Sequence, residues 1–166
     1  MQVLAITNQK GGVGKSSTAS SIGSAYTAQG QRVLFVDLDA QGNLSYSIKA
    51  STTGKSAFDV LMGEATAPEA IQHTAAGDII SASPALASAD ITLTTTGKEY
   101  RLREALEALR GKYDLVIIDT PPALGILTVN ALAAADGVII PAQADFFSLQ
   151  GIGQLNSTIE AVKKIS

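Results

Sequence analysis

Residues 9–17 read Gln9-Lys10-Gly11-Gly12-Val13-Gly14-Lys15-Ser16-Ser17, between an apolar run and a run rich in alanine and serine. The glycines let backbone N–H groups turn toward an anion, because no Cβ blocks the approach. Lys15 can place its charge on the β- and γ-phosphates of a nucleotide, and the Ser16 hydroxyl can bind Mg²⁺. The helix expected next offers its N-terminus to the phosphates. The segment therefore predicts a phosphate-binding loop.

One position departs from the general phosphate-loop pattern G-x-x-x-x-G-K-[ST]. Gln9 stands where that pattern has its first glycine, and a second lysine, Lys10, follows it. The segment also begins like the G-x-G-x-x-G of dinucleotide-binding folds. Ser17 stands in place of the third glycine of that motif, which leaves Lys15 and Ser16 without a part. A dinucleotide-binding fold is therefore the weaker alternative.

The bulk composition is that of a globular protein. The chain has 166 residues, of which 46% are hydrophobic and 16% charged, and we predict a single domain over residues 1–166. A net charge of −3 argues against attraction of the whole chain to nucleic acid, and the lack of cysteine excludes disulfides and thiolate metal sites. The N-terminus runs into a strand rather than a signal peptide, and no apolar run reaches the ~20 residues of a membrane span. We expect a cytoplasmic protein.

Strand and helix signals alternate along the chain. Apolar runs predict strands at 3–6, 32–36, 78–82, 113–118 and 137–141. Helical patterns cover 16–29, 98–110, 124–135 and 147–165, and shorter helices start near Ser56, Ala67 and Ser83. Residues 42–80 carry the weakest signals, and His73 reads as a surface or helix-end histidine. The alternation predicts an α/β fold in three layers, a mostly parallel sheet with helices on both faces.

Three aspartates follow predicted buried strands. Asp37 and Asp39 end the second strand, and Asp119 precedes a Pro-Pro turn after a later one. Ligands of open α/β sheets bind at the carboxyl ends of the strands, so these side chains should converge with the glycine loop. A magnesium nucleotide site needs a hydroxyl and an acidic residue at the metal, which are Ser16 and Asp119 here. Hydrolysis needs a group that orients water, and Asp37 and Asp39 are placed for it.

Four segments together resemble one family. Residues 10–17 are similar to the deviant Walker A motif of the ParA/MinD superfamily of P-loop ATPases. Residues 36–43 resemble its V-D-x-D-x-Q-G-N segment, residues 114–122 its Walker B segment, and residues 141–147 with Gly151 a further ParA/Soj stretch. The Gln-Gly-Asn at 41–43 favours the ParA/Soj branch over the MinD branch. The resemblance covers essentially the whole chain.

The resemblance implies roles for individual residues. Lys10 would reach across a homodimer to the partner's phosphates, so that hydrolysis requires dimerisation. Asp39 would position the attacking water, and Asp37 would lie by the magnesium and the lysine. ATP or ADP and Mg²⁺ are the implied cofactors. The implied catalytic residues are Lys10, Lys15, Asp39 and Asp37; the nucleotide ligands are Gly11, Gly12, Val13, Gly14, Lys15, Ser16, Ser17 and Pro141; the metal ligands are Ser16, Asp37 and Asp119.

The family's function implies an ATP-dependent switch for plasmid or chromosome partitioning. Such proteins respond to a ParB-like centromere-binding partner and bind DNA without sequence preference, which places them on the nucleoid, and no membrane partner is implied. Family members are usually longer, and the part that completes the sheet and carries the basic DNA surface is not in this chain. The fold is therefore expected to lack the family's C-terminal strands. Residues 1–166 are either the N-terminal part of a longer protein, which the stop inside an amphipathic pattern favours, or a reduced member that keeps the phosphate and magnesium chemistry.

Two alternatives stay open. One is a MinD-like positioning or scaffold ATPase that acts on a membrane or a protein machine. The other is a module that holds nucleotide without turning it over.

Overall fold

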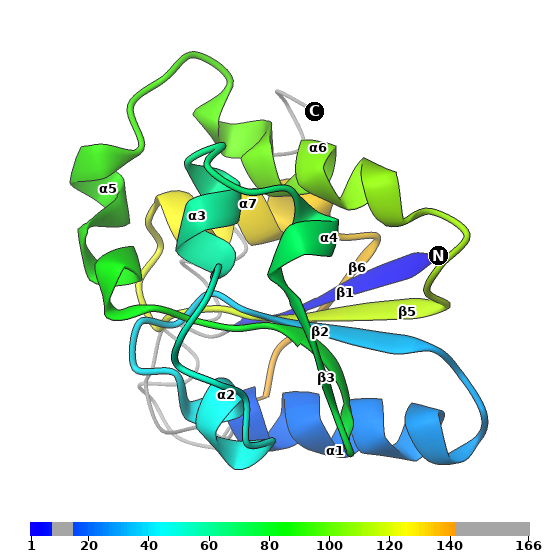
Figure 1. Cartoon of the computed structure of the whole chain (residues 1–166). Helices are drawn as coiled ribbons and strands as arrows, with labels where there is room; N and C mark the ends of the chain where they lie inside the picture. The colour runs from blue at the N-terminus through cyan, green and yellow to red at the C-terminus, as the bar shows by residue number, and fades with distance from the viewer. Residues whose placement is uncertain (8–14, 142–166) are drawn as a thin grey trace, which may run out of the picture.

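The computed structural model describes residues 1–7 and 15–141. Six strands form one sheet in the order β3-β4-β2-β5-β1-β6 (Figure 1). Every pair is parallel except β3 with β4, which is antiparallel. The strands are β1 (Gln2–Ile6), β2 (Val33–Asp37), β3 (Ile71–Thr74), β4 (Gly77–Ile80), β5 (Leu115–Asp119) and β6 (Gly137–Ile139). The predicted α/β class with a mostly parallel sheet is confirmed.

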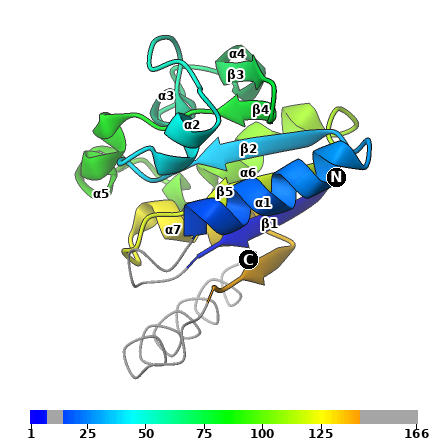
Figure 2. The ribbon, with the colours of Figure 1, turned by 90° about the horizontal axis from the view of Figure 1, so that it is seen from below.

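Helices cover both faces of this sheet, so the predicted three layers are also confirmed (Figures 1 and 2). Helices α1 and α2 lie on one face, and α3, α4, α6 and α7 lie on the other. The α-helices are α1 (Lys15–Ala28), α2 (Asn43–Ser47), α3 (Ala57–Leu61), α4 (Ala67–Ala70), α5 (Ala89–Thr92), α6 (Arg101–Leu106) and α7 (Ile126–Ala134). Three 3₁₀ helices are η1 (Pro84–Ser88), η2 (Lys98–Tyr100) and η3 (Glu107–Leu109).

The strands are continuously apolar because each feeds two cores. In β2, Leu34 and Val36 join the cluster that contains the apolar residues of α3, α6 and α7. Val33 and Phe35 point the other way and pack with Ala19 of α1. Successive side chains of a strand face opposite sides of the sheet, so a strand covered on both faces buries every residue. All five residues of β2 and of β5 are buried accordingly.

Close packing against the sheet explains why Gly23, the one glycine inside α1, lacks a side chain. A Cβ built on its backbone would fall on the ring of Phe35, which is fully buried in β2. The helix can lie this close to the sheet only because the residue has no side chain. The position therefore fixes the distance between α1, whose first residues are Lys15 and Ser16, and the strands beneath it.

Replacing Gly23 by alanine should destabilise the chain despite alanine's higher helix propensity. Overpacking of a full core typically costs about 1–3 kcal/mol, which exceeds the propensity gain of at most ~1 kcal/mol. Chemical denaturation measures the free energy of unfolding, and the exposed neighbour change Ser24→Ala is the matched control. Adding Phe35→Leu to Gly23→Ala should recover part of the loss, because the shorter side chain vacates the space. Equal stability of Gly23→Ala and the parent would contradict the close packing.

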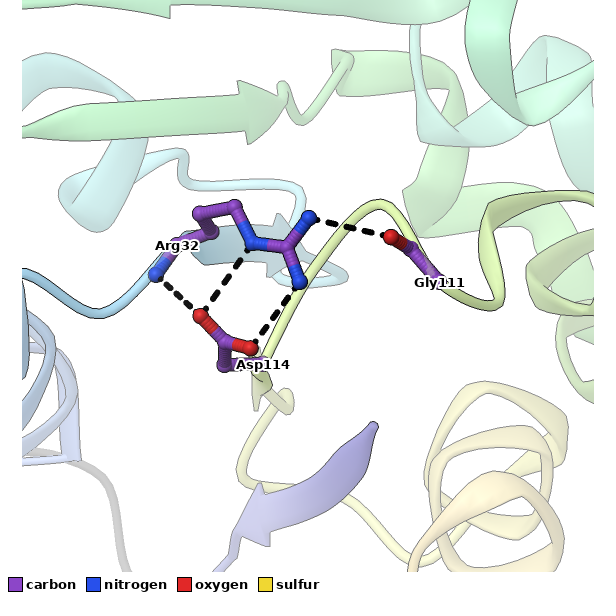
Figure 3. A network of polar contacts seen from close by, with 3 residues as sticks. All are labelled: Arg32, Gly111 and Asp114. Carbon is purple, nitrogen blue, oxygen red and sulfur yellow. Dashed lines mark hydrogen bonds and ion pairs between the residues drawn. The ribbon is translucent and has the colours of Figure 1, made fainter.

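At the amino ends of β2 and β5, Arg32 and Asp114 bind each other (Figure 3). The Arg32 Nε and NH2 groups donate to the two Asp114 carboxylate oxygens at 3.3 and 3.0 Å, and NH1 donates to the Gly111 carbonyl at 3.0 Å. The backbone N–H of Arg32 donates to Asp114 Oδ2 at 2.8 Å. This pairing lowers the pKa of Asp114 to about 2. It supports the register that sets Val33 opposite Leu115.

The edge hairpin was not predicted. The expected strand at 78–82 is β4, but β3 precedes it and pairs antiparallel across a short turn in which Thr74 Oγ1 donates to the Gly77 carbonyl at 2.6 Å. Strand β3 reads Ile-Gln-His-Thr, too short and too polar to stand out by periodicity. His73 lies on it with an exposed side chain, as predicted for a surface residue, and its Nδ1 is 2.7 Å from Asp78 Oδ1.

Most predicted helix boundaries are confirmed. Ser56 and Thr66 cap α3 and α4 with reciprocal capping boxes, and the Ser83 hydroxyl accepts the Ala85 N–H at the start of η1. The single helix expected at 98–110 consists of η2, α6 and η3 in succession. The helix expected at 147–165 lies outside the described residues. Among the helices of the described ranges, none has the length and apolar character needed to cross a membrane.

Candidate functional site

The sheet register brings the predicted acidic residues together. Ile6 and Asp37 both lie opposite Asp119, in the last row of the three central strands. Paired residues of parallel strands point to the same face, so the Asp37 and Asp119 side chains project to the side that carries Phe35 and α1. That side is where the first turn of α1, with Lys15 and Ser16, begins. The predicted convergence at the carboxyl ends of the strands is present for these residues.

Asp119 is the most perturbed group of the site. It is fully buried, and its Oδ2 accepts the Ser16 hydroxyl at 2.6 Å. Its Oδ1 has no hydrogen-bond donor within the described ranges. Burial raises the pKa of Asp119 to about 7, helped by the nearby Asp37 and Asp39 carboxylates and opposed by the Ser16 hydrogen bond and the Lys15 charge. One oxygen of this buried carboxylate is therefore left without a donor from the described residues.

A divalent cation fits this pair of groups. A buried carboxylate oxygen without a donor is costly unless a cation or a cation's water satisfies it. Mg²⁺ prefers oxygen ligands and is usually held by one or two side chains together with phosphates and water. The Asp119 Oδ1 atom and the Ser16 hydroxyl supply such oxygens next to each other. The residues present therefore suit a magnesium ion bound with a nucleotide.

Lys15 opens α1, and its side chain is buried. A helix leaves its first four N–H groups without intrahelical partners, and they carry the positive end of the helix dipole. The 14-residue α1 therefore presents both a lysine and the amides of its first turn where its axis meets the sheet edge. Phosphate groups are the anions that such an end suits.

Asp37 is fully buried, and protein donors occupy both of its oxygens. Oδ2 accepts the N–H and the hydroxyl of Ser45 at 2.9 and 2.7 Å, and Oδ1 accepts the N–H of Asp39 at 3.1 Å. Burial raises its pKa, whereas the Ser45 and Asp39 hydrogen bonds lower it and the Asp39 charge raises it further. Gly42, at the N-cap of α2, has no side chain that could cap this helix. The Asp37 carboxylate caps it instead, by accepting the N–H of Ser45 in the first turn.

Asp39 lies at the wall of a cavity of about 770 Å³. Its Oδ1 accepts the Gln41 N–H at 3.1 Å, and its carbonyl accepts the Gly42 N–H at 2.8 Å. The cavity is lined mainly by polar side chains at the start of α1 and in the loop after β2, and its volume suits a nucleotide-sized ligand. The lining residues are Lys15, Ser16, Ser17, Ser20, Ser21, Asp39, Gln41, Asn43, Ser47 and Pro122.

Of the other predicted site residues, two lie within the described ranges and five lie outside them. Ser17 is exposed and lines the cavity, and Pro141 follows β6, the neighbour of β1 at the same sheet edge. The remaining five lie outside the described residues: Lys10, Gly11, Gly12, Val13 and Gly14. For these the roles stay predictions.

The sequence did not identify Ser45, Pro122 or Gln41 as site residues. Ser45 binds Asp37, and Pro122 and Gln41 line the cavity. Pro122 and Gln41 stand inside the quoted family segments, so the motifs could have indicated them. Ser45 follows two residues after the Gln-Gly-Asn, and no local pattern marks a serine that bonds eight residues back.

A parallel sheet with a buried aspartate beside the Lys-Ser start of the first helix defines a P-loop type of nucleotide-binding protein. Comparison with known proteins supports this class. A family model described as "AAA domain" matches residues 1–166, the whole chain. The chain belongs to this family, as a P-loop ATPase of the ParA/Soj type, which confirms the resemblance seen in the sequence.

The similar proteins include named partition proteins. The chromosome partitioning protein ParA of Caulobacter vibrioides is 48% identical over 170 residues, which cover 98% of this chain and 64% of that protein. The sporulation initiation inhibitor protein Soj of Bacillus subtilis is 43% identical, over 98% of this chain and 66% of its own length. The present chain thus spans about two thirds of the length of these two relatives.

Solved structures agree on the fold. Cobyrinic acid a,c-diamide synthase from Mycobacterium smegmatis, solved with bound ADP and magnesium, superposes with a TM-score of 0.94 at 44% identity. The match covers 99% of this chain and 69% of that one. The same protein with an ATP analogue and magnesium gives the same TM-score.

Proposed function

We propose that this chain binds Mg-ATP and hydrolyses it as a dimerising switch for plasmid or chromosome partitioning. The observation that carries the proposal is the buried Asp119 carboxylate, which has the Ser16 hydroxyl on one oxygen and no donor from the described residues on the other. A metal-bound nucleotide would supply the missing positive charge. The ADP and the ATP analogue held with magnesium by the Mycobacterium smegmatis protein support the same assignment.

Each residue has a distinct part in this proposal. Lys15 and the first amides of α1 hold the phosphates, together with residues 11–14 of the loop and Ser17. Ser16 and Asp119 would hold the magnesium, which would supply positive charge to neutralise the phosphate oxygens. Asp39, at the cavity wall, orients the attacking water. The metal role of Asp37 and the nucleotide contact of Pro141 remain predictions, and the three protein hydrogen bonds of Asp37 favour a positioning part.

The partition role rests on the named relatives. Lys10 would act on the nucleotide of a second copy, a ParB-like protein would stimulate hydrolysis, and nonspecific DNA would be the surface on which the dimer works. The synthase name of the Mycobacterium smegmatis neighbour is an observation in favour of a second candidate, ATP chemistry without partitioning. Both candidates share the magnesium nucleotide site and differ in what hydrolysis drives.

Phosphate release from Mg-ATP tests the proposal. Lys15→Ala should lower turnover at least about 100-fold, because it removes the cation that faces the developing phosphate charge. Lys112→Ala, an exposed lysine after η3 at the other end of the sheet, is the matched control and should hydrolyse as the parent does. Stimulation by a ParB-like protein with DNA supports partitioning. A turnover rate that stays the same when the ParB-like protein and DNA are added favours the synthase-like candidate. Tight ATP binding without phosphate release under all conditions contradicts the proposed hydrolysis.

A further inference from the structure

Ser45 joins three parts of the fold. Its N–H and its hydroxyl both donate to Asp37 Oδ2, and its hydroxyl oxygen accepts the Ala82 N–H at 3.0 Å. Ser45 belongs to α2, Asp37 ends β2, and Ala82 lies two residues beyond β4. One hydroxyl group therefore ties a short helix to the carboxyl ends of two neighbouring strands. It does so as donor and acceptor at once, which few side chains can do.

Asp37 in turn holds the backbone of Asp39 by a hydrogen bond. With Oδ2 held by Ser45, the other oxygen of the same carboxylate accepts the Asp39 N–H at 3.1 Å. A carboxylate is planar, so fixing one oxygen fixes the direction of the other. The Asp39 backbone is thereby held next to β2, and its own Oδ1 is oriented by the Gln41 N–H. The position of Asp39 at the cavity wall thus depends on where Ser45 holds Asp37.

Helix α2 offers little support of its own. It has five residues, and its N-cap Gly42, at φ 68°, provides no side-chain cap. Helices this short are marginal in isolation, so their placement depends on tertiary contacts. The hydrogen bonds between Asp37 and Ser45 are such contacts, because they satisfy an amide of the first turn that would otherwise lack a partner.

We propose that Ser45 is a positioning residue for the reaction, which holds Asp39 in place through Asp37. The inference rests on the proposed function, in which Asp39 orients the attacking water. Alanine at this position leaves the Ala82 N–H without its acceptor and Asp37 Oδ2 with one donor instead of two. Threonine keeps the hydroxyl and both bonds.

The test compares the parent chain with Ser45→Ala, Ser45→Thr and the control Ser88→Ala. Ser88 is exposed and donates only to the Ala85 carbonyl within η1, at 3.0 Å. Amide hydrogen exchange of the nucleotide-free chains measures the protection of Asp39 and Ala82, and nucleotide affinity and kcat are measured separately. We expect faster exchange at both amides in Ser45→Ala and a kcat lower by about 10- to 100-fold, since small misplacements of a catalytic group have effects of this size. Affinity for Mg-ATP should stay within about twofold of the parent, because the phosphate contacts are made by other residues.

Ser45→Thr should restore both exchange protection and turnover, and Ser88→Ala should change neither. Where Ser45→Ala does not fold, Ser45→Cys, a weaker donor and acceptor, takes its place in the comparison. Unchanged exchange at Asp39, an equal loss of affinity and turnover, or a threonine variant as impaired as the alanine one would overturn the proposal. A parent chain that binds Mg-ATP without hydrolysing it refutes the proposed function, and the Asp39 exchange rate alone then decides the positioning role.

Discussion

Asp119→Asn is expected to abolish magnesium-dependent ATP hydrolysis and, in the ligand-free chain, to raise the free energy of unfolding above pH 7. The loss of activity should be at least about 100-fold, because the amide cannot neutralise the metal and its waters as a carboxylate does. The gain in stability follows from burial. The carboxylate is fully buried beside Asp37, and its pKa is raised to about 7.

The pH dependence has a definite sign. Below about pH 4 the Asp119 carboxyl is protonated in both the folded and the unfolded chain, and above about pH 7 it is ionised in both. Between these values only the folded chain keeps the proton, so the free energy of unfolding falls as pH rises through this window. A raised pKa of about 3 units corresponds to about 4 kcal/mol at about 1.4 kcal/mol per unit, so we expect Asp119→Asn to gain about 2–4 kcal/mol at pH 8.

Thermal unfolding at pH 5 and pH 8 measures this difference. The variant should already be more stable than the parent by about 1–2 kcal/mol at pH 5, and the gap should widen so that it melts roughly 5–10 °C higher at pH 8. Added magnesium with ATP should stabilise the parent but not the variant at pH 8. Asp114→Asn is the control of opposite sign, because its pKa is lowered to about 2 by Arg32, so its removal cannot stabilise the chain at pH 8. A lower melting temperature for Asp119→Asn at pH 8 would show that the buried charge is not unfavourable.

Lys10→Ala is expected to bind Mg-ATP nearly as the parent does and to hydrolyse it about 100- to 1,000-fold more slowly, which is the usual effect of removing a group that stabilises transition-state charge. If the variant hydrolyses as fast as the parent, the proposed mechanism is wrong. Lys55→Ala, an exposed lysine of the loop before α3, is the matched control.

Mixing two inactive variants shows whether Lys10 acts on the nucleotide of the other subunit or on the nucleotide bound to its own subunit. Asp39→Ala retains Lys10 but lacks the group proposed to orient water. In a dimer of Lys10→Ala with Asp39→Ala, one site has both an intact Asp39 and a Lys10 from the other subunit. An equal mixture should then recover about a quarter of the parent activity, since half the dimers are mixed and each has one working site. A mixture as inactive as its components would mean that Lys10 acts within its own subunit.

The sequence alone determined the fold class and the edge of the sheet where the site lies. The signals are local: runs such as Val33 to Val36 are apolar at every position, which only a strand covered on both faces tolerates. The Lys15-Ser16 pair after a glycine loop marks the start of α1, and aspartates that end buried strands must lie at the carboxyl edge. The part proposed for Lys10 came from the family resemblance, which also chose Asp39 over Asp37 as the residue that positions the attacking water.

The tertiary structure decided the state of each acidic group and the contacts that hold it. Asp37 and Asp119 look alike in sequence, yet the first has donors on both oxygens and the second has one oxygen without a donor in the described chain. The Asp39 N–H donates to one Asp37 oxygen, and Ser45 donates to the other from a helix too short to predict. The strand β3 likewise forms through its pairing with β4 rather than through its own pattern. Burial and hydrogen bonding depend on residues distant in sequence, and no window of local sequence contains them.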